Sequence, residues 1–273
     1  MKGNTMKKWT AVVMCSLIIC STVWADANSI APAADKLGFS IGSDFFTKYV
    51  WRGQVITNGA AFQPSVTATY GHWTANVWGN ADMTDYRNRS GKVTEYDLTL
   101  DYSNKFSEDS KVGYSIGTIH YHFPSFSYTD TTEIYWGFNF DVPLSPAIKV
   151  YHGLGNENGT YINASIGHTY EKVITFDADK CFCNLQWGAS LGWGNSTYNR
   201  DYWVNKSDGK QVSGSRLNDL ALTLALPICF PGGWTVRPNI NYVTLADGAI
   251  RSADTYARSS DYFFTGINIT KTF

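Results

Sequence analysis

Apolar and polar residues alternate along most of this chain, in segments of about ten residues separated by turn residues. The first segment, 37–52, places Leu37, Phe39, Ile41, Phe45, Tyr49 and Trp51 against Ser40, Asp44, Lys48 and Arg52. Successive side chains of a β-strand point to opposite faces, so this segment is a strand with one apolar and one charged face. The apolar faces are long and carry large aromatic rings. The pattern therefore predicts a barrel whose outer surface contacts lipid.

The pattern recurs about twelve times and predicts an all-β, transmembrane, antiparallel up-and-down barrel with an even number of strands. The predicted strands are 37–52, 61–71, 73–83, 94–103, 112–122, 132–142, 147–155, 160–170, 184–194, 217–227, 234–244 and 260–273. In strand 112–122 the apolar positions change phase near Ile119, and a β-bulge is the expected cause.

The predicted connections differ in length between the two ends of the barrel. Those at one end are mostly long and those at the other are short: 84–93, 123–131, 195–216 and 245–259 against Gly71-His72 and Pro143–Pro146. Long external loops and short periplasmic turns are typical of outer-membrane barrels, so the long connections are predicted to lie outside the cell. The exception is 171–183, a long connection on the predicted periplasmic side.

The first residues have the features of an export signal. A basic start is followed by an apolar stretch from Ala11 to Cys20, and Val23-Trp24-Ala25 supplies the small residues of a cleavage site. The apolar stretch is too short to span a membrane. We predict a cleaved signal peptide at 1–25, a periplasmic segment at 26–36 and a barrel at 37–273, in the outer membrane of a Gram-negative bacterium. A lipoprotein signal with Cys20 as the lipidated residue is the alternative.

Composition agrees with this class of protein. Aromatic residues make up 15% of the chain and charged residues only 16%, which suits strands with aromatic girdles. The net charge is −1, so no nucleic-acid partner is predicted. No cofactor is predicted.

Cysteines remain in the exported part of the chain at Cys181, Cys183 and Cys229. In an oxidising compartment, a disulfide from Cys181 or Cys183 to Cys229 is a candidate, with one thiol left over. A metal site built from these thiols has no nearby histidine to complete it, and no metal site is predicted.

The faces opposite the lipid are expected to line the lumen. The charged residues on these faces are Asp44, Lys48, Arg52, Asp82, Glu95, Asp97, Asp101, Glu133, Asp141, Lys149, Asp219 and Arg237. Those toward the outer ends of their strands predict a charged constriction that selects solutes by charge and size: Arg52, Asp82, Glu95, Glu133 and Asp219. In the alternative, the same groups pair with one another and fill a narrow lumen, because twelve strands lie between the closed and the open barrel sizes. Residues 28–36 are a further candidate plug.

The histidines make a lipid-modifying barrel enzyme a further class to consider. His120 and His122 share a face at the end of a predicted strand, with Ser125 and Ser127 in the next loop. Such enzymes need a nucleophile, a base and a polar residue that orients the base. No motif here supplies all three, so these histidines are interpreted as membrane-interface residues and no catalytic residue is predicted.

The run Ser43–Gln54, with Tyr49, Arg52 and Gly53, resembles the opening of the TorF-type porins. Those proteins have a similar Ser-x-Tyr-x-x-Arg-Gly segment, followed by a strand pair rich in glycine and aromatic residues. Further segments of the chain look like strands of that family: 63–67, 75–80, 131–137 and 159–165. The resemblance covers about residues 38–195. It implies an outer-membrane barrel of porin type and names no solute.

The last residues, from Phe263 to Phe273, alternate and end in phenylalanine. This looks like the closing strand that the barrel assembly machinery recognises, although Lys271 stands where an aromatic residue is usual. We therefore predict a porin-like channel for small solutes, with outer-membrane lipid, lipopolysaccharide and the assembly machinery as partners. The alternatives are a non-conducting barrel that acts through its external loops, in adhesion or as a scaffold, and a lipid-modifying enzyme.

Overall fold

The computed structural model describes residues 36–273, apart from 127–128, 156, 178–179, 206–207 and 254–258. The predicted signal peptide at 1–25 and residues 26–35 lie outside the described residues. The candidate plug at 28–36, except for its last residue, and Ser127 lie outside them as well.

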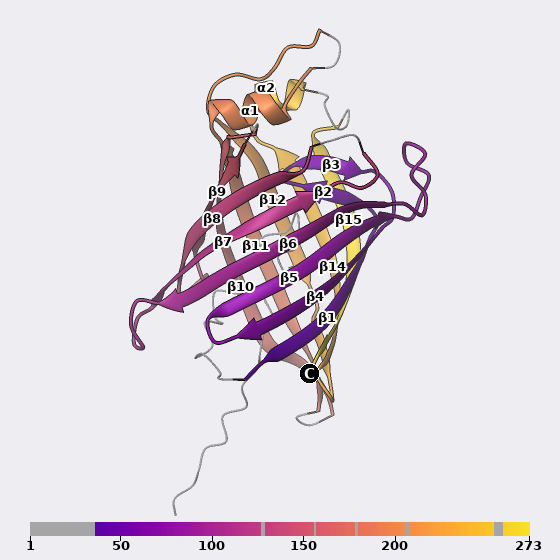
Figure 1. Ribbon diagram of the computed structural model, residues 1–273. Helices are drawn as coiled ribbons and strands as arrows, with labels where there is room; N and C mark the ends of the chain where they lie inside the picture. The colour runs from indigo at the N-terminus through magenta and orange to yellow at the C-terminus, as the bar shows by residue number, and fades with distance from the viewer. Residues whose placement is uncertain (1–35, 127–128, 156, 178–179, 206–207, 254–258) are drawn as a thin grey trace, which may run out of the picture.

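Twelve strands form the wall of a closed, antiparallel β-barrel (Figure 1). They are β1 (Gly38–Phe46), β4 (Ala61–Tyr70), β5 (Trp73–Asp82), β6 (Val93–Lys105), β7 (Val112–His122), β8 (Thr131–Phe140), β9 (Ala147–Leu154), β10 (Thr160–Asp177), β11 (Cys181–Gly194), β12 (Arg216–Ala225), β14 (Trp234–Leu245) and β15 (Asp261–Thr272). Each pairs with the next along the chain, and β1 pairs with β15 from Ser40↔Thr272 to Phe46↔Gly266 to close the circle. The predicted fold class is confirmed.

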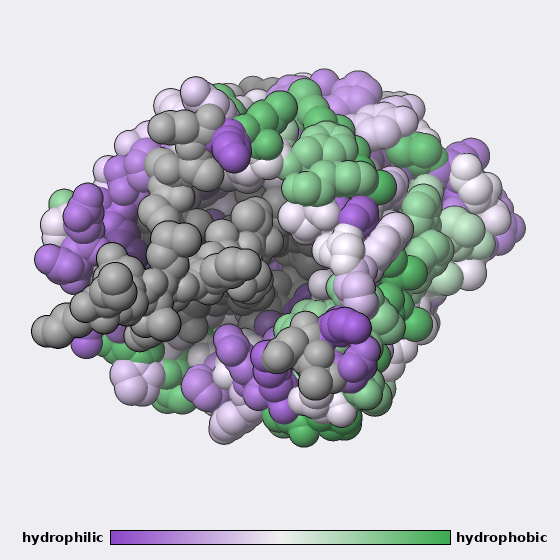
Figure 2. All heavy atoms as spheres, turned by 90° about the horizontal axis from the view of Figure 1, so that it is seen from below, coloured by the Kyte–Doolittle hydropathy of each residue, from purple (hydrophilic) through white to green (hydrophobic). Residues whose placement is uncertain are grey.

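The outer surface of the wall is apolar. Alternate residues expose large apolar side chains, such as Leu98 and Leu100 of β6. Near the end with the short turns, Trp73 of β5 packs on Tyr102 of β6 with ring centroids 5.1 Å apart. Figure 2, seen from this end, shows hydrophobic side chains gathered on the outside of the wall. An apolar belt with an aromatic rim is the surface of a barrel that spans a membrane.

The inner face of the wall is polar and buried. Its buried uncharged residues include Gln63, Thr67, Asn76, Asn80, Gln186, Ser190, Thr223, Asn239, Asn241 and Asn268. Many of them bond across strands, as where the Thr223 hydroxyl donates to Asn241 Oδ1 at 2.8 Å. A barrel that is apolar outside and polar inside reverses the arrangement of a soluble barrel.

The first wall strand is shorter than predicted. β1 ends at Phe46, whereas alternation predicts a strand through residue 52. The chain then leaves the wall and forms a separate two-stranded hairpin, β2 (Tyr49–Trp51) and β3 (Gln54–Thr57), before β4 returns to pair with β1. The hairpin strands continue the alternation of β1, so the pattern alone does not mark the break.

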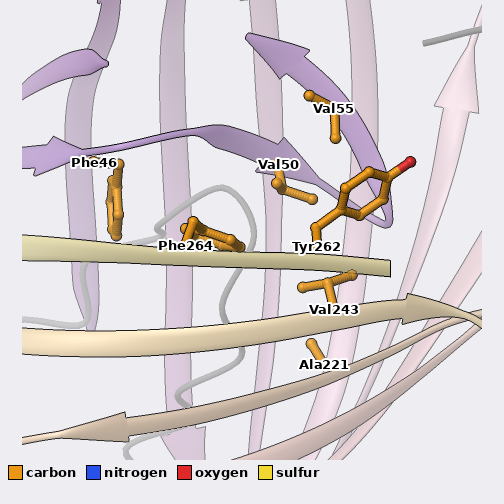
Figure 3. Packing of buried hydrophobic residues seen from close by; sticks show 7 residues of the cluster. All are labelled: Phe46, Val50, Val55, Ala221, Val243, Tyr262 and Phe264. Atoms are coloured by element: carbon orange, nitrogen blue, oxygen red, sulfur yellow. The ribbon is translucent and has the colours of Figure 1, made fainter. Parts of the chain in front are cut away.

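The hairpin lies inside the barrel. Val50 of β2 and Val55 of β3 are 0% and 1% exposed, and they belong to a buried cluster whose other members come from the wall. Figure 3 shows the two valines pointing toward Tyr262, Val243 and the neighbouring wall residues. This cluster is an apolar patch on an otherwise polar inner face, and it fixes one side of the hairpin to β12, β14 and β15.

Strand β7 runs without the predicted bulge. Its register with β6 and with β8 is continuous from end to end. The phase change arises because Ile119 and Tyr121 point inward, where they are 3% and 5% exposed and pack with Tyr135 of β8. The bulge prediction is therefore wrong: the apolar residues change face because the lumen here is lined by a small apolar cluster.

Most of the predicted connection 171–183 is also strand. β10 continues to Asp177 and β11 begins at Cys181, and they pair beyond a register shift that follows Tyr170. The β-branched and aromatic run Val173–Phe176 favours a strand over a loop. The long periplasmic connection was therefore a wrong prediction.

All three described cysteines are free thiols. The short strand β13 (Ile228–Phe230) pairs with β11 so that Cys229 stands opposite Phe182, and Cys183 stands opposite Ile228. Opposite residues of an antiparallel pair share a face, so Cys181 and Cys183 point to the other face from Cys229. The predicted disulfide is not formed in this structure.

Two short helices lie above the end of the barrel that carries the long connections, which we call the outer mouth (Figure 1). Asn195 caps α1 (Ser196–Tyr202), and Asp247 caps α2 (Gly248–Ser252) by accepting from Ala249 N at 2.7 Å. Partial burial opposes ionisation of Asp247, but the bond from Ala249 and the Arg216 guanidinium hold the pKa of this carboxyl below its usual value. No helix among the described residues is long and apolar enough to cross a membrane.

Candidate functional site

The tip of the β2–β3 hairpin is a tight two-residue turn. Arg52 and Gly53 have φ angles of 46° and 78°, and Trp51 pairs with Gln54 across the turn. Positive φ at both central residues matches the right-handed twist of a hairpin, and glycine adopts it without strain. A Cβ at position 53 would also lie 2.8 Å from atoms of Asp219 and Leu245. The Arg-Gly pair therefore sets the shape of the tip and lets it approach the wall.

Arg52 projects from this tip into a site built by β8, β9 and β10. Its Nη1 and Nη2 donate to Glu133 Oε1 and Oε2 at 2.8 and 2.7 Å. The guanidinium carbon also lies 4.4 to 4.6 Å from the ring centroids of Trp51, Tyr151 and Tyr161. Both charged side chains are nearly buried, at 9% and 6% exposure. A bidentate ion pair inside an aromatic cage is among the strongest polar contacts in proteins.

Other hairpin residues bind further carboxylates of the wall. The Tyr49 hydroxyl donates to Glu95 Oε2 at 2.9 Å, and the Thr57 hydroxyl donates to Asp82 Oδ1 at 2.6 Å. Arg89, from the connection after β5, forms an ion pair with Asp82 at 2.9 Å and donates to the Ile56 carbonyl at 3.0 Å. Arg89 therefore fixes the base of the hairpin to the wall.

Asp219 completes the ring of carboxylates around the hairpin. It lies on β12 beside Gly53, and its Oδ1 accepts from the Tyr161 hydroxyl at 2.9 Å. Tyr161 also belongs to the Arg52 cage, so one tyrosine links the two groups. Through these contacts the hairpin reaches wall strands on opposite sides of the lumen.

The structure brings together the charged residues that the sequence places at the outer mouth. Asp82, Glu95, Glu133 and Asp219 surround the hairpin that carries Arg52. Arg52 lies at the tip of this inserted hairpin and not on the wall strand that alternation predicts. The arrangement is a ring of charged residues, as expected for a constriction. The charges also pair with one another, as expected for a lumen that they fill.

The remaining predicted lumen residues lie in three places. Asp44 and Asp97 are buried on the inner wall, at 1% and 8% exposure. Asp101 accepts from the Tyr135 hydroxyl at 2.5 Å, Lys149 lies over the Tyr135 ring, and Arg237 donates to Gln186 Oε1 at 3.2 Å. Lys48 contacts Asn58 at the base of the hairpin, and Asp141 is exposed in a short turn.

The tyrosines of the site were not predicted from the sequence. Tyr121, Tyr151 and Tyr161 point inward from the wall, and Tyr121 donates to Glu133 Oε2 at 2.9 Å. Tyr198 of α1 packs on Tyr161. Aromatic residues on a barrel strand are usually assigned to the lipid face. The signal that finds the hairpin is local: Arg52-Gly53 is a two-residue turn between Tyr49–Trp51 and Gln54–Thr57, which are both strand-like.

The histidines of β7 face outward. His122 Nδ1 lies 2.9 Å from Asp130 Oδ1, His120 Nε2 lies 3.7 Å from Asp130 Oδ2, and His122 stacks on Tyr96. Ser125 donates to the Val93 carbonyl at 2.5 Å. The described part of the chain contains no group of three or more His, Cys, Asp or Glu residues placed to hold a metal ion.

No protein-family model and no curated protein matches this chain. Solved structures do match it. A structure titled "KdgM porin in complex with disordered oligogalacturonate" matches with a TM-score of 0.50 and 11% identity, over 86% of this chain and 99% of that one. The COG4313 outer membrane channel from Pseudomonas putida F1 matches with a TM-score of 0.51 and 9% identity, over 90% and 99%. At these identities the likeness shows a shared barrel fold.

Proposed function

We propose that this protein is a porin-like outer-membrane channel for the passive diffusion of small solutes, with a constriction formed by the β2–β3 hairpin at the outer mouth. The observation that carries the proposal is a closed barrel with an apolar exterior, a polar interior and a charged hairpin bound across one end. Polar groups along a lumen replace part of the hydration shell of a passing solute, and a ring of fixed charges selects among solutes.

Several finer points belong to the same proposal. The barrel is exported through a cleaved signal peptide at 1–25, has a periplasmic segment at 26–36, and belongs with the TorF-type porins. Its exterior contacts outer-membrane lipid and lipopolysaccharide. The assembly machinery recognises β15 and Phe273, the residue that follows it. Phe273 packs on Phe39 with ring centroids 5.7 Å apart and donates its backbone N–H to the Phe39 carbonyl.

Single-channel recording in planar bilayers tests the channel. Pure, folded protein is expected to give discrete ion-permeable steps, smaller than those of open sixteen-stranded porins because the hairpin narrows the lumen. Folding is checked beforehand by the shift in gel mobility on heating. The absence of conductance steps from folded protein at high concentration would refute the proposal.

A second candidate function rests on the same hairpin. The tip binds wall strands on opposite sides of the lumen. In addition, the segment after α1 packs on α2 and on the end of β14 in a buried cluster of Trp203, Val212, Leu245, Ile250 and Ala253, so the outer mouth is a well-packed surface. A non-conducting barrel that acts as an adhesin or scaffold would use this surface. The absence of conductance together with specific binding to envelope or host components would favour this function.

We also propose that the barrel has no catalytic activity. The histidines of β7 contact Asp130, but the hydroxyl of Ser125 donates to the Val93 carbonyl and not to either histidine. A lipid-hydrolysis assay on outer-membrane lipids, with His120→Ala and His122→Ala as controls, is expected to show no difference among the three proteins. Turnover by the unmodified protein that is lost in either variant would overturn this.

A further inference from the structure

The inner face of β6 carries a row of carboxylates. Glu95 and Asp97 occupy alternate positions and are 6% and 8% exposed, Thr99 follows, and Asp101 continues the row toward the other end of the barrel. Residues two apart on a strand share a face, so the row runs along the lumen from the hairpin inward.

The neighbouring wall strands place no positive charge against this row. Trp78 of β5 and Tyr121 of β7 stand directly opposite Asp97, and Asn80 stands opposite Glu95. The basic residues of this region are engaged elsewhere. Arg52 is paired with Glu133, Arg89 is paired with Asp82, and the Lys149 amine lies 4.9 Å from the Tyr135 ring centroid.

Asp97 differs from the other carboxylates of the row. Glu95 accepts from Tyr49, and Asp101 accepts from Tyr135. Asp97 Oδ1 is buried and has no hydrogen-bond partner among the described residues. A buried carboxylate oxygen without a donor is costly unless a cation or water reaches it.

We propose that the Glu95–Asp97–Asp101 row is a cation lane, with Asp97 as its central site, that binds and passes small monovalent cations. This inference rests on the proposed channel function and specifies its substrate class. Fixed carboxylates raise the local concentration of cations and exclude anions, most strongly in a narrow lumen with a low-dielectric wall. A polyanion such as the oligogalacturonate named with the KdgM porin is therefore not a substrate of this lumen.

The test is the reversal potential of the full-length mature protein in a planar bilayer under a potassium chloride gradient. The unmodified channel is expected to favour K⁺ over Cl⁻. Asp97→Asn should lower the K⁺/Cl⁻ permeability ratio by roughly threefold, and Glu95→Gln should lower it by less, because the Tyr49 hydroxyl already offsets part of that charge. Asp109→Asn, which removes the same charge from an exposed turn, is the matched control and should leave the ratio unchanged.

The possible outcomes separate the two proposals. A conducting channel that prefers Cl⁻, or one in which Asp97→Asn and Glu95→Gln both behave like Asp109→Asn, overturns the cation lane and leaves the channel standing. Folded protein that does not conduct overturns the channel and the lane together. A loss of K⁺ preference in Asp97→Asn or Glu95→Gln, whichever variant folds, supports the lane.

Discussion

The two sides of the lumen are polar in different ways. The side formed by β5 to β8 is acidic, with Asp82, Glu95, Asp97, Asp101 and Glu133. The side formed by β11 to β15 is mainly neutral and carries amides and hydroxyls. Asn241, for example, accepts from Thr223 at 2.8 Å and donates to Asn239 Oδ1 at 2.7 Å. The hairpin contacts this side through the apolar cluster of Val50 and Val55, and not through an ion pair between described residues.

The acidic side depends on the hairpin region for its partners. Arg52, Tyr49 and Thr57 of the hairpin bind Glu133, Glu95 and Asp82. Without them, like charges would face one another in a poorly solvated space, which is unfavourable. The comparison indicates that the hairpin narrows the outer mouth and also supplies the partners of the carboxylates on the acidic side.

Glu133→Gln should have the largest effect on stability, because it leaves the nearly buried Arg52 without its counter-charge. We expect a loss of about 3 kcal/mol in the free energy of unfolding. The matched change on the neutral side, Asn241→Ala, removes uncharged hydrogen bonds only and should cost about 1 kcal/mol. Urea titration in detergent micelles, followed by tryptophan fluorescence, measures both. Equal losses would contradict the difference between the two sides.

Gly53→Ala should have the next largest effect. It forces an alanine into positive φ at the hairpin tip and places a Cβ against Asp219 and Leu245, so a loss of about 2 kcal/mol is expected. Gly71 has φ of 58° with nothing within 4 Å of a Cβ, so Gly71→Ala isolates the backbone contribution and should cost about 1 kcal/mol. If the two variants unfold at the same urea concentration, the tip is not tightly packed.

The smallest expected effects are on ion selectivity. Arg52→Ala exposes Glu133 and should raise the K⁺/Cl⁻ permeability ratio, whereas Glu95→Ala removes a negative charge and should lower it, each by about twofold. Reversal potentials in a salt gradient measure both shifts. Unchanged ratios in the two variants would mean that the charges of the outer mouth do not act on passing ions.

Much of the barrel follows from the alternation of residues, because a strand that separates lipid from water must alternate. The strands with the clearest alternation, such as β5 and β6, are found close to their predicted ranges. The pattern fails where a residue points inward for packing rather than for polarity. Ile119, Tyr121 and the two valines of the hairpin are examples, since apolar residues in a lumen look the same in sequence as apolar residues on the lipid face.

The sequence indicates which charged residues belong to the site but not that a hairpin inside the barrel brings them together. Position along each strand predicts that Asp82, Glu95, Glu133 and Asp219 lie near one end of the barrel, and in the structure all four lie beside the hairpin. The contact between Arg52 and Glu133 forms because the chain leaves the wall after Phe46. This departure depends on tertiary pairing, since Phe46 pairs with Ala61 and so excludes the hairpin from the wall. In the sequence, only the Arg52-Gly53 turn indicates that a hairpin forms here.

The central claim is that the hairpin limits passage through the barrel, and its most direct test is the conductance of a chain that lacks the hairpin. Because Phe46 pairs directly with Ala61, deleting residues 49–57 leaves a short loop that joins β1 to β4 without altering the wall register. Recorded side by side in planar bilayers, the deleted protein should give single-channel steps several-fold larger than those of the full-length protein. Equal steps from the two folded proteins would contradict the account.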